Sequence, residues 1–195
     1  MQEFINGIIS NLQDIVNNSP LILGILFSAF IIIMESIIPV LPLGVFIAIN
    51  MVLLGNTLGY IVSWIATCLG CLLSFLLVRK VFYKRFNEKN TKKEKINKIL
   101  KKMNNISFSG FVVITALPFT PAFLINIASG LSKMELKKFM TGILIAKVFI
   151  VYFWGFIGTT FLQSVTDIKV IIELVVMLLT AYLLSKLVMK KYNIN

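Results

Sequence analysis

The sequence predicts an all-α, polytopic membrane protein, and three observations point to this fold class. Hydrophobic residues make up 58% of the 195-residue chain and charged residues only 14%, and the mean hydropathy is +0.92. A soluble domain of this size carries more charge. Most of the 19 basic residues gather in one loop and at the C-terminal end, as the positive-inside rule describes. We expect residues 1–195 to form a single membrane domain with about four transmembrane helices and two oppositely facing re-entrant helical hairpins.

Residues 20–78 are expected to form the first half of this domain. An amphipathic helix over residues 2–18 precedes it, with apolar residues at helical spacing and polar residues opposite. The stretch from Pro20 to Met34 is uncharged and apolar. It is short for a span but could cross the bilayer if Glu35, which follows it, lies near the far side.

A broken segment follows at residues 36–54. Pro39 and Pro42 interrupt an otherwise apolar run, and proline leaves backbone groups without helical partners. Lipid supplies no replacement hydrogen bonds, so such backbone is tolerated at membrane depth only where it faces protein or a polar cavity. We expect a re-entrant hairpin here, then a transmembrane helix over residues 60–78 with a stripe of small residues on one face.

Residues 79–105 form the predicted cytoplasmic loop. From residue 79 to residue 102 there are eleven basic residues and two acidic ones. The basic residues are Arg79, Lys80, Lys84, Arg85, Lys89, Lys92, Lys93, Lys95, Lys98, Lys101 and Lys102. This pattern is typical of a solvated topology signal rather than of a specific partner site. A nucleic-acid surface is not expected, because no basic face is interleaved with aromatic side chains.

Residues 106–189 are expected to form the second half. A re-entrant hairpin is predicted over residues 107–131, which contain prolines and glycines but no charge. Transmembrane helices are predicted over residues 139–162 and 170–188. The distribution of charge places both termini on the cytoplasmic side, and the lysine-, asparagine- and isoleucine-rich composition hints at a bacterial plasma membrane.

Cysteine and histidine usage predicts neither a metal site nor a cofactor. Cys68 and Cys71 are the only cysteines, they lie within an apolar helix, and the chain has no histidine. No further ligand is available to complete a metal site. No serine–lysine or paired-aspartate dyad can be placed either, so the sequence does not predict an enzyme.

The two broken segments match each other. Each has a P-x-x-P spacing, then an asparagine in an apolar run, then a glycine. These residues are Pro39, Pro42, Asn50 and Gly55 in the first segment and Pro118, Pro121, Asn126 and Gly130 in the second. Paired broken helices in an inverted repeat are the sequence signature of a transporter-type site near the bilayer midplane. Hairpins with a purely structural role are the alternative, and the asparagines could equally cap hairpin backbone groups.

This order of residues resembles the DedA superfamily, also called VTT-domain or SNARE-associated Golgi proteins, over about residues 20 to 165. The residues that carry the resemblance are Glu35, Pro39, Pro42, Gly55 and Gly59, then Leu117, Pro118, Pro121, Asn126, Gly130, Leu131 and Phe139. The resemblance implies two oppositely facing re-entrant hairpins. It also implies lipid movement across the bilayer, either flipping of undecaprenyl phosphate or phospholipid or scrambling, with proton coupling suggested for some members.

The chain departs from the family pattern at three positions. Family members often carry arginines where this sequence has Thr115 and Pro121, and an acidic residue where it has Leu43. The sequence is therefore identified as a divergent branch of the family.

Lys147 is the residue that could replace those missing charges. An ammonium near the middle of a transmembrane helix costs at least about 2.5–3.5 kcal/mol unless it is paired or solvated. Three interpretations remain open: snorkelling to the surface, an ion pair with Glu35, or binding of an anionic headgroup. The predicted substrate pathway is lined by Glu35, Pro39, Pro42, Pro118, Pro121, Asn126, Gly130 and Lys147.

The function that these features favour is transport of a membrane lipid, through binding and passage rather than bond-making. An ion-coupled transporter of a small solute would use the same hairpins. A membrane scaffold or assembly factor, with the basic loop as its partner site, is the third class. The sequence leaves the oligomeric state open.

Overall fold

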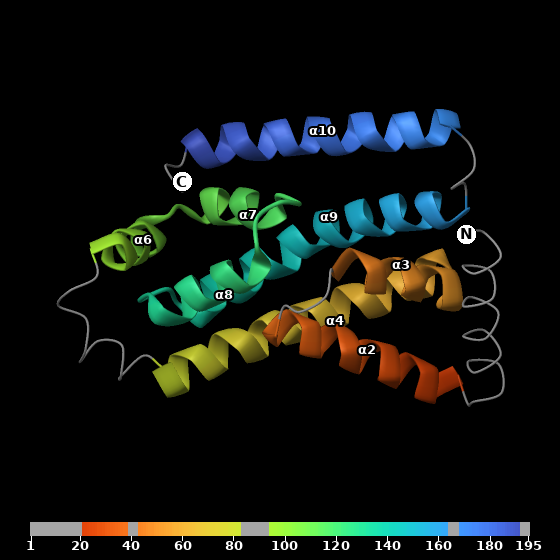
Figure 1. Cartoon of the computed structure of the whole chain (residues 1–195). Helices are drawn as coiled ribbons and strands as arrows, with labels where there is room; N and C mark the ends of the chain where they lie inside the picture. Colours follow the sequence, from red (N-terminus) through yellow and green to blue (C-terminus); the bar gives the residue numbers. More distant parts are fainter. Residues whose placement is uncertain (1–20, 39–42, 83–93, 164–167, 192–195) are drawn as a thin grey trace.

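The computed structural model describes residues 21–38, 43–82, 94–163 and 168–191, and within these ranges every regular element is a helix (Figure 1). The elements are α2 (Leu21–Ile37), α3 (Leu43–Leu54), α4 (Asn56–Leu77) with a π-helical end η1 (Val78–Phe82), α6 (Glu94–Asn105), α7 (Phe108–Ala116), α8 (Ala122–Leu131), α9 (Leu136–Gln163) and α10 (Ile168–Lys191). The amphipathic helix predicted over residues 2–18 lies outside the described residues, as do Pro39 and Pro42.

Within the described residues, three helices are long and apolar enough to cross a membrane: α4, α9 and α10. The first apolar stretch, predicted as a further span, is not among them, because α2 has only 17 described residues. At 1.5 Å per residue its length is about 25 Å, short of the roughly 30 Å hydrocarbon core. The first apolar stretch is therefore not a span of the same kind as the other three.

Instead, α2 and α3 form one helical hairpin. The chain enters α2 at the end of the molecule where α10 begins, and α3 returns toward that end (Figure 1). Helix α2 continues through Glu35 to Ile37, and the Ile38 N–H still donates to the Met34 carbonyl at 2.9 Å. The structure thus ends this helix at Ile37, whereas the sequence places the start of the broken segment at residue 36. Proline cannot continue a helix, and Pro39 follows two residues later in the sequence.

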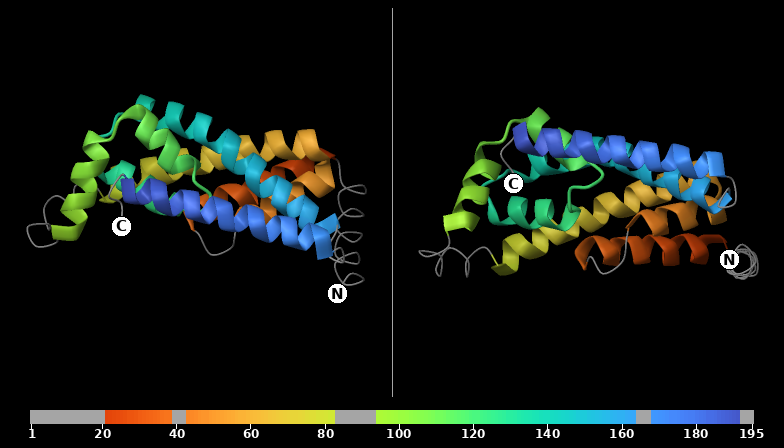
Figure 2. Two further views of the ribbon diagram at one scale, coloured as in Figure 1. Left: turned by 90° about the horizontal axis from the view of Figure 1, so that it is seen from above. Right: turned by 45° about the horizontal axis from the view of Figure 1, so that its top comes forward.

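The second hairpin consists of α7 and α8, within the range predicted from the sequence. Ser107 caps α7, because its Oγ accepts the Gly110 N–H at 3.1 Å. Residues 117–121 form the tip, where the Thr120 N–H donates to the Leu117 carbonyl at 3.2 Å. The two hairpins reach the middle of the molecule from opposite ends (Figures 1 and 2).

Helices α4 and α9 lie antiparallel at the centre. The Tyr60 hydroxyl donates to the Val148 carbonyl at 3.0 Å, and the Trp64 indole N–H donates to the Leu144 carbonyl at 3.1 Å. The hairpins pack on this pair reciprocally: α2 on α4 and α3 on α9, α7 on α9 and α8 on α4. A single residue, Gly55, joins α3 to α4 with a φ of 81°, a value that favours glycine.

Small residues allow these helices to approach closely. A Cβ on Gly70 of α4 would lie 2.5 Å from the Ser36 Cβ of α2, and one on Gly158 of α9 would lie 2.2 Å from the Ala48 Cβ of α3. Gly130 of α8 is similarly close to Val78. The stripe of small residues predicted on α4 is confirmed, because it is buried throughout. Membrane helices commonly associate through such residues.

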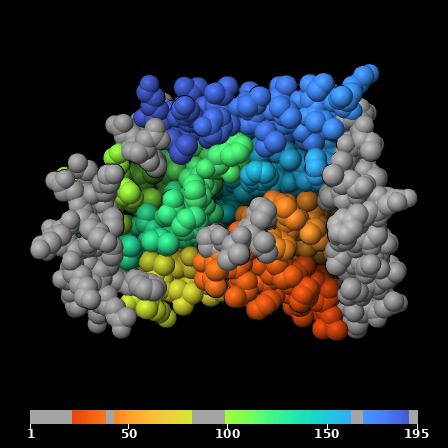
Figure 3. Space-filling view, in the orientation of Figure 1, coloured from red at the N-terminus to blue at the C-terminus, as the bar shows by residue number. Residues whose placement is uncertain are grey.

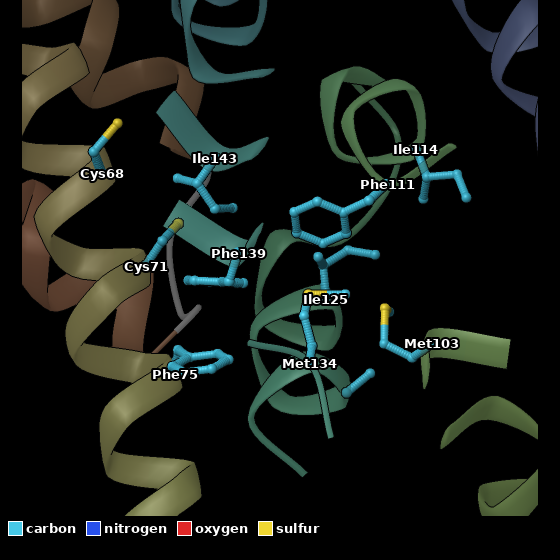
Figure 4. Close-up of a cluster of buried hydrophobic side chains, with 11 residues drawn as sticks. Cys68, Cys71, Phe75, Met103, Phe111, Ile114, Ile125, Met134, Phe139 and Ile143 are labelled. Carbon is cyan, nitrogen blue, oxygen red and sulfur yellow. The ribbon is translucent and has the colours of Figure 1, made fainter. Parts of the chain in front are cut away.

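An apolar cluster fixes the second hairpin to the central pair (Figure 4). Phe75 of α4 stacks on Phe139 of α9 with ring centroids 4.3 Å apart. Phe111 of α7 lies 5.9 Å from the same Phe139 ring. Within a bilayer such clusters stabilise through packing rather than through exclusion of water.

Arg79 ties the end of α4 to the end of α8. Its guanidinium donates to the carbonyls of Gly130 (3.2 Å), Met134 (2.9 Å), Ser132 (2.7 Å) and Ser129 (3.1 Å). It also lies 4.4 Å from the centroid of the Phe75 ring. The last carbonyls of a helix lack helical partners and carry partial negative charge, so a cation there is favourable. Arg79 is thus a structural residue as well as part of the basic segment.

The predicted basic loop also contains structure. Its last part forms helix α6, which packs on α8. Together with the beginning of α9 and the end of α10, α6 lies at one end of the molecule, and this basic end carries Lys101, Lys133 and Lys190 (Figure 1). Helix α10 runs along an edge of the molecule (Figure 3), and only 11% of its most apolar 18-residue stretch is buried.

Gly70→Ala is expected to destabilise the protein by roughly 1–3 kcal/mol, because the added methyl group overpacks the crossing of α2 and α4. Thermal unfolding in detergent measures this. Leu69→Ala, which removes a side chain that is 44% exposed, should leave the melting temperature nearly unchanged. An equal effect of the two substitutions would contradict the close crossing.

Arg79→Ala is expected to lower stability by about 3 kcal/mol, since a hydrogen bond to a charged group contributes roughly 1.5–3 kcal/mol. Arg79→Lys should recover only part of this, because an ammonium lacks the planar fork. The control is Lys80→Ala, which removes the neighbouring exposed charge. Unfolding by denaturant should show a much larger loss of unfolding free energy in Arg79→Ala than in Lys80→Ala. Equal losses in the two variants would mean that only the positive charge matters.

Candidate functional site

Lys147 is buried at the middle of α9. Only 2% of the residue is exposed, and it lies roughly 17 Å along the axis from the start of the helix. Among the described residues its ammonium makes no hydrogen bond and no direct ion pair. The side chain therefore does not reach a surface by snorkelling.

Glu35 faces the same region from the last turns of α2. It is half-buried, and the charge of Lys147 is close enough to act on its carboxylate. Within the described part of the chain, the Glu35 carboxylate and the Lys147 ammonium form neither a salt bridge nor a hydrogen bond. The two charges therefore interact through space without a direct contact.

Two aromatic residues hold α9 on either side of Lys147. The Leu144 and Val148 carbonyls that receive the Trp64 and Tyr60 hydrogen bonds flank Lys147 in sequence. Trp64 and Tyr60 are four residues apart and so share one face of α4. They fix the position of α9 against α4 at the depth of the buried ammonium, a role the sequence pattern did not reveal for Trp64.

Asn126 is a second buried polar group, on α8. It is 0% exposed, and neither its amide nitrogen nor its amide oxygen has a hydrogen-bond partner. It shares a face with Gly130, which packs on Val78, so it is directed toward α4. The expected backbone cap is therefore absent, and the buried amide keeps unmet hydrogen-bonding capacity, which is costly without a partner.

Other polar side chains of the second hairpin share this property. The hydroxyls of Thr115, Thr120 and Ser129 are buried without partners. The first half differs, because the Asn50 amide donates to the Ser63 hydroxyl at 3.1 Å. Asn50 therefore bonds to a side chain of α4 instead of capping hairpin backbone groups, as the sequence suggested. Unpartnered polar atoms within the described residues thus concentrate in the second hairpin.

The remaining predicted site residues have other positions. Pro118 lies half-buried in the tip, and Pro121 is exposed at the start of α8. Gly130 is a packing residue, because Val78 fills the space beside it and Arg79 binds its carbonyl.

An apolar crevice of about 480 Å³ lies between the second hairpin tip, α9 and α10. Its walls include Pro118, Phe149, Phe156 and Ala181. Phe149 and Phe156 are on the face of α9 opposite Lys147. Helix α9 therefore separates a charged site from an apolar crevice.

The described residues offer no cluster of three or more His, Cys, Asp or Glu that could hold a metal ion. Cys68 and Cys71 are buried and free. The chemistry available is that of one ammonium, one carboxylate and several unpartnered amide and hydroxyl groups. Such a set is suited to binding a polar or anionic group.

Comparison with known proteins places this arrangement in a family. The chain is similar to the membrane protein YhjE of Bacillus subtilis (strain 168), with 26% identity over 164 residues, which is 84% of this chain and 79% of YhjE. It is also similar to YqeD of the same organism, with 25% identity over 125 residues, or 64% of this chain and 60% of YqeD. No solved structure matches significantly.

The VTT-domain family model matches residues 38–160, which is more than half of the chain. The matched region begins just after α2, includes α3, α4, α6, α7 and α8, and ends within the last turn of α9. The chain belongs to the VTT-domain (DedA) family of membrane proteins.

Proposed function

We propose that this membrane protein transports a lipid with an anionic headgroup, a polyprenyl phosphate or a phospholipid, across the bilayer. The observation that carries the proposal is the buried, directly unpaired ammonium of Lys147 at mid-depth. Isolated charges at this depth are expensive, and they commonly mark substrate pathways. A phosphate is the natural partner, because charge-assisted hydrogen bonds are about twice as strong as neutral ones.

The neighbouring groups support this assignment. Asn126 and Thr115 provide unpartnered donors in the second hairpin, as a hydrated headgroup requires. Glu35 is near enough to Lys147 to balance its charge when no headgroup is bound. In this proposal Glu35 and the phosphate compete for the lysine, so headgroup binding and protonation of Glu35 are linked.

The two hairpins form the proposed inverted repeat. Exchange of α2, α3 and α4 with α7, α8 and α9 converts the packing of α2 on α4 into that of α7 on α9, and the packing of α3 on α9 into that of α8 on α4. The packing of α3 on α4 has no counterpart of similar extent. Inverted repeats place a substrate site near the midplane and allow access from alternate sides. We assign the broken tips to re-entrant hairpins that face each other across this site.

The basic end of the molecule is proposed to face the cytoplasm of a plasma membrane. Helix α2 would then enter from the opposite side, and the C-terminal end of α10 would lie inside. Ile168→Cys should react with a membrane-impermeant maleimide in intact cells, whereas Lys133→Cys should react only after permeabilisation. The background carries Cys68→Ser and Cys71→Ser. The reverse labelling pattern would invert the orientation.

Lys147→Met is expected to reduce lipid translocation in proteoliposomes by about 10- to 100-fold, because a charged hydrogen bond contributes roughly 1.5–3 kcal/mol. Lys147→Arg keeps the charge and should retain much of the rate. Glu35→Gln should lower translocation and alter its pH dependence, and the double variant should not be additive. Fluorescent phospholipids and a tagged polyprenyl phosphate serve as substrates.

Ile145→Ala is the matched control, because this residue is on the same helix and 44% exposed. Unchanged translocation in Lys147→Met would overturn the role of the lysine. Flux of a small solute that requires a counter-ion, without lipid translocation by the wild-type protein, would replace the lipid proposal. Loss of a cellular phenotype on deletion of the basic loop, with translocation intact, would add a scaffold role.

A further inference from the structure

Trp154 of α9 lies where parts of both hairpins meet. A Cβ added to Gly44, in the first turn of α3, would be 2.8 Å from the Trp154 ring. On another side, Phe119 from the second hairpin tip meets the indole at 6.2 Å between centroids and an interplanar angle of 72°. One side chain thus contacts the start of α3 and the tip between α7 and α8.

Phe119 extends this junction to α10. Its ring lies 5.7 Å from the Tyr182 ring at an angle of 86°. Edge-to-face pairs of this kind have defined geometry and stabilise beyond simple packing. We call Phe119, Trp154 and Tyr182, together with the Gly44 backbone, the aromatic junction.

The junction and Lys147 lie on the same face of α9. Trp154 follows Lys147 by seven residues, which is two helical turns, so the two side chains share one face of α9. They are separated by roughly 10 Å along the axis. Because α9 begins at the basic end, Trp154 lies on the side of Lys147 away from that end.

We infer that Phe119 and Trp154 are positioning residues that hold the start of α3 and the tip between α7 and α8 together and close the Lys147 site toward the non-basic side. In this inference a headgroup that leaves Lys147 in that direction passes the junction, and the two rings separate during each passage. This inference rests on the proposed function for the identity of the passing group. Closure of the site by the junction can be measured without any transport.

The experiment measures access to residue 147 rather than flux. A Lys147→Cys variant, with Cys68→Ser and Cys71→Ser, is exposed to a charged, membrane-impermeant thiosulfonate on one side of right-side-out and inside-out vesicles. The side on which Ile168→Cys reacts defines the non-basic side. Trp154→Ala and Phe119→Ala are each added to this background, and Trp154→Phe tests rescue by an aromatic ring.

Trp154→Ala should raise the modification rate at residue 147 by about tenfold from the non-basic side, as expected for loss of aromatic contacts. The rate from the basic side should not change. Phe119→Ala should act in the same direction, and Trp154→Phe should restore much of the protection. Phe161→Ala, an aromatic residue on the same helix that is 48% exposed, should have no effect.

Three outcomes overturn the inference. The first is an unchanged rate in Trp154→Ala, and the second is an equal increase from both sides, which indicates general loosening. The third is no reaction in any variant, because the junction would then not be what closes the site. Failure of lipid translocation with the one-sided increase intact would reject the proposed function and leave the junction standing.

Discussion

The buried ammonium of Lys147 is the constraint on which the rest of this structure depends. An ammonium in hydrocarbon is tolerated only with polar neighbours, and the first half of the chain brings polar groups to this lysine of the second half. Helix α2 contributes Glu35, whose carboxylate feels the charge of Lys147. Helix α4 fixes the depth of the lysine through Tyr60 and Trp64, which bind the backbone of α9 on either side of it.

In the proposed re-entrant arrangement the two hairpins carry a second cost, that of broken helices at membrane depth. Backbone that leaves the helical pattern must be enclosed by protein or must line a polar cavity. Close packing through Gly70 and Gly130 and the carbonyl contacts of Arg79 enclose the hairpins against α4. The polar atoms left without partners, above all those of Asn126, then lie inside the protein. The packing that encloses the hairpins thus also buries these unpartnered polar atoms.

Sequence patterns predicted some of these features and missed others for physical reasons. The limits of the second hairpin follow from its prolines and lack of charge, and Lys147 stands out because lysine is rare in apolar helices. Helix α2 is a hairpin limb of 17 residues in the structure, and a limb of that length has the hydropathy of a short span. Arg79 resembled a topology signal, since its four carbonyl partners lie about fifty residues away in sequence. The different contacts of Asn50 and Asn126 depend on tertiary neighbours that no local pattern contains.

The central claim is that an anionic headgroup binds at Lys147 between the two hairpin tips. An experimental structure of the protein in a bilayer containing a phosphate-headgroup lipid tests it most directly. The account predicts headgroup density within hydrogen-bond distance of the Lys147 Nζ, on the side of α9 that faces Glu35 and α4. Density for Lys147 bonded only to protein groups, with headgroups confined to the two surfaces, would contradict it.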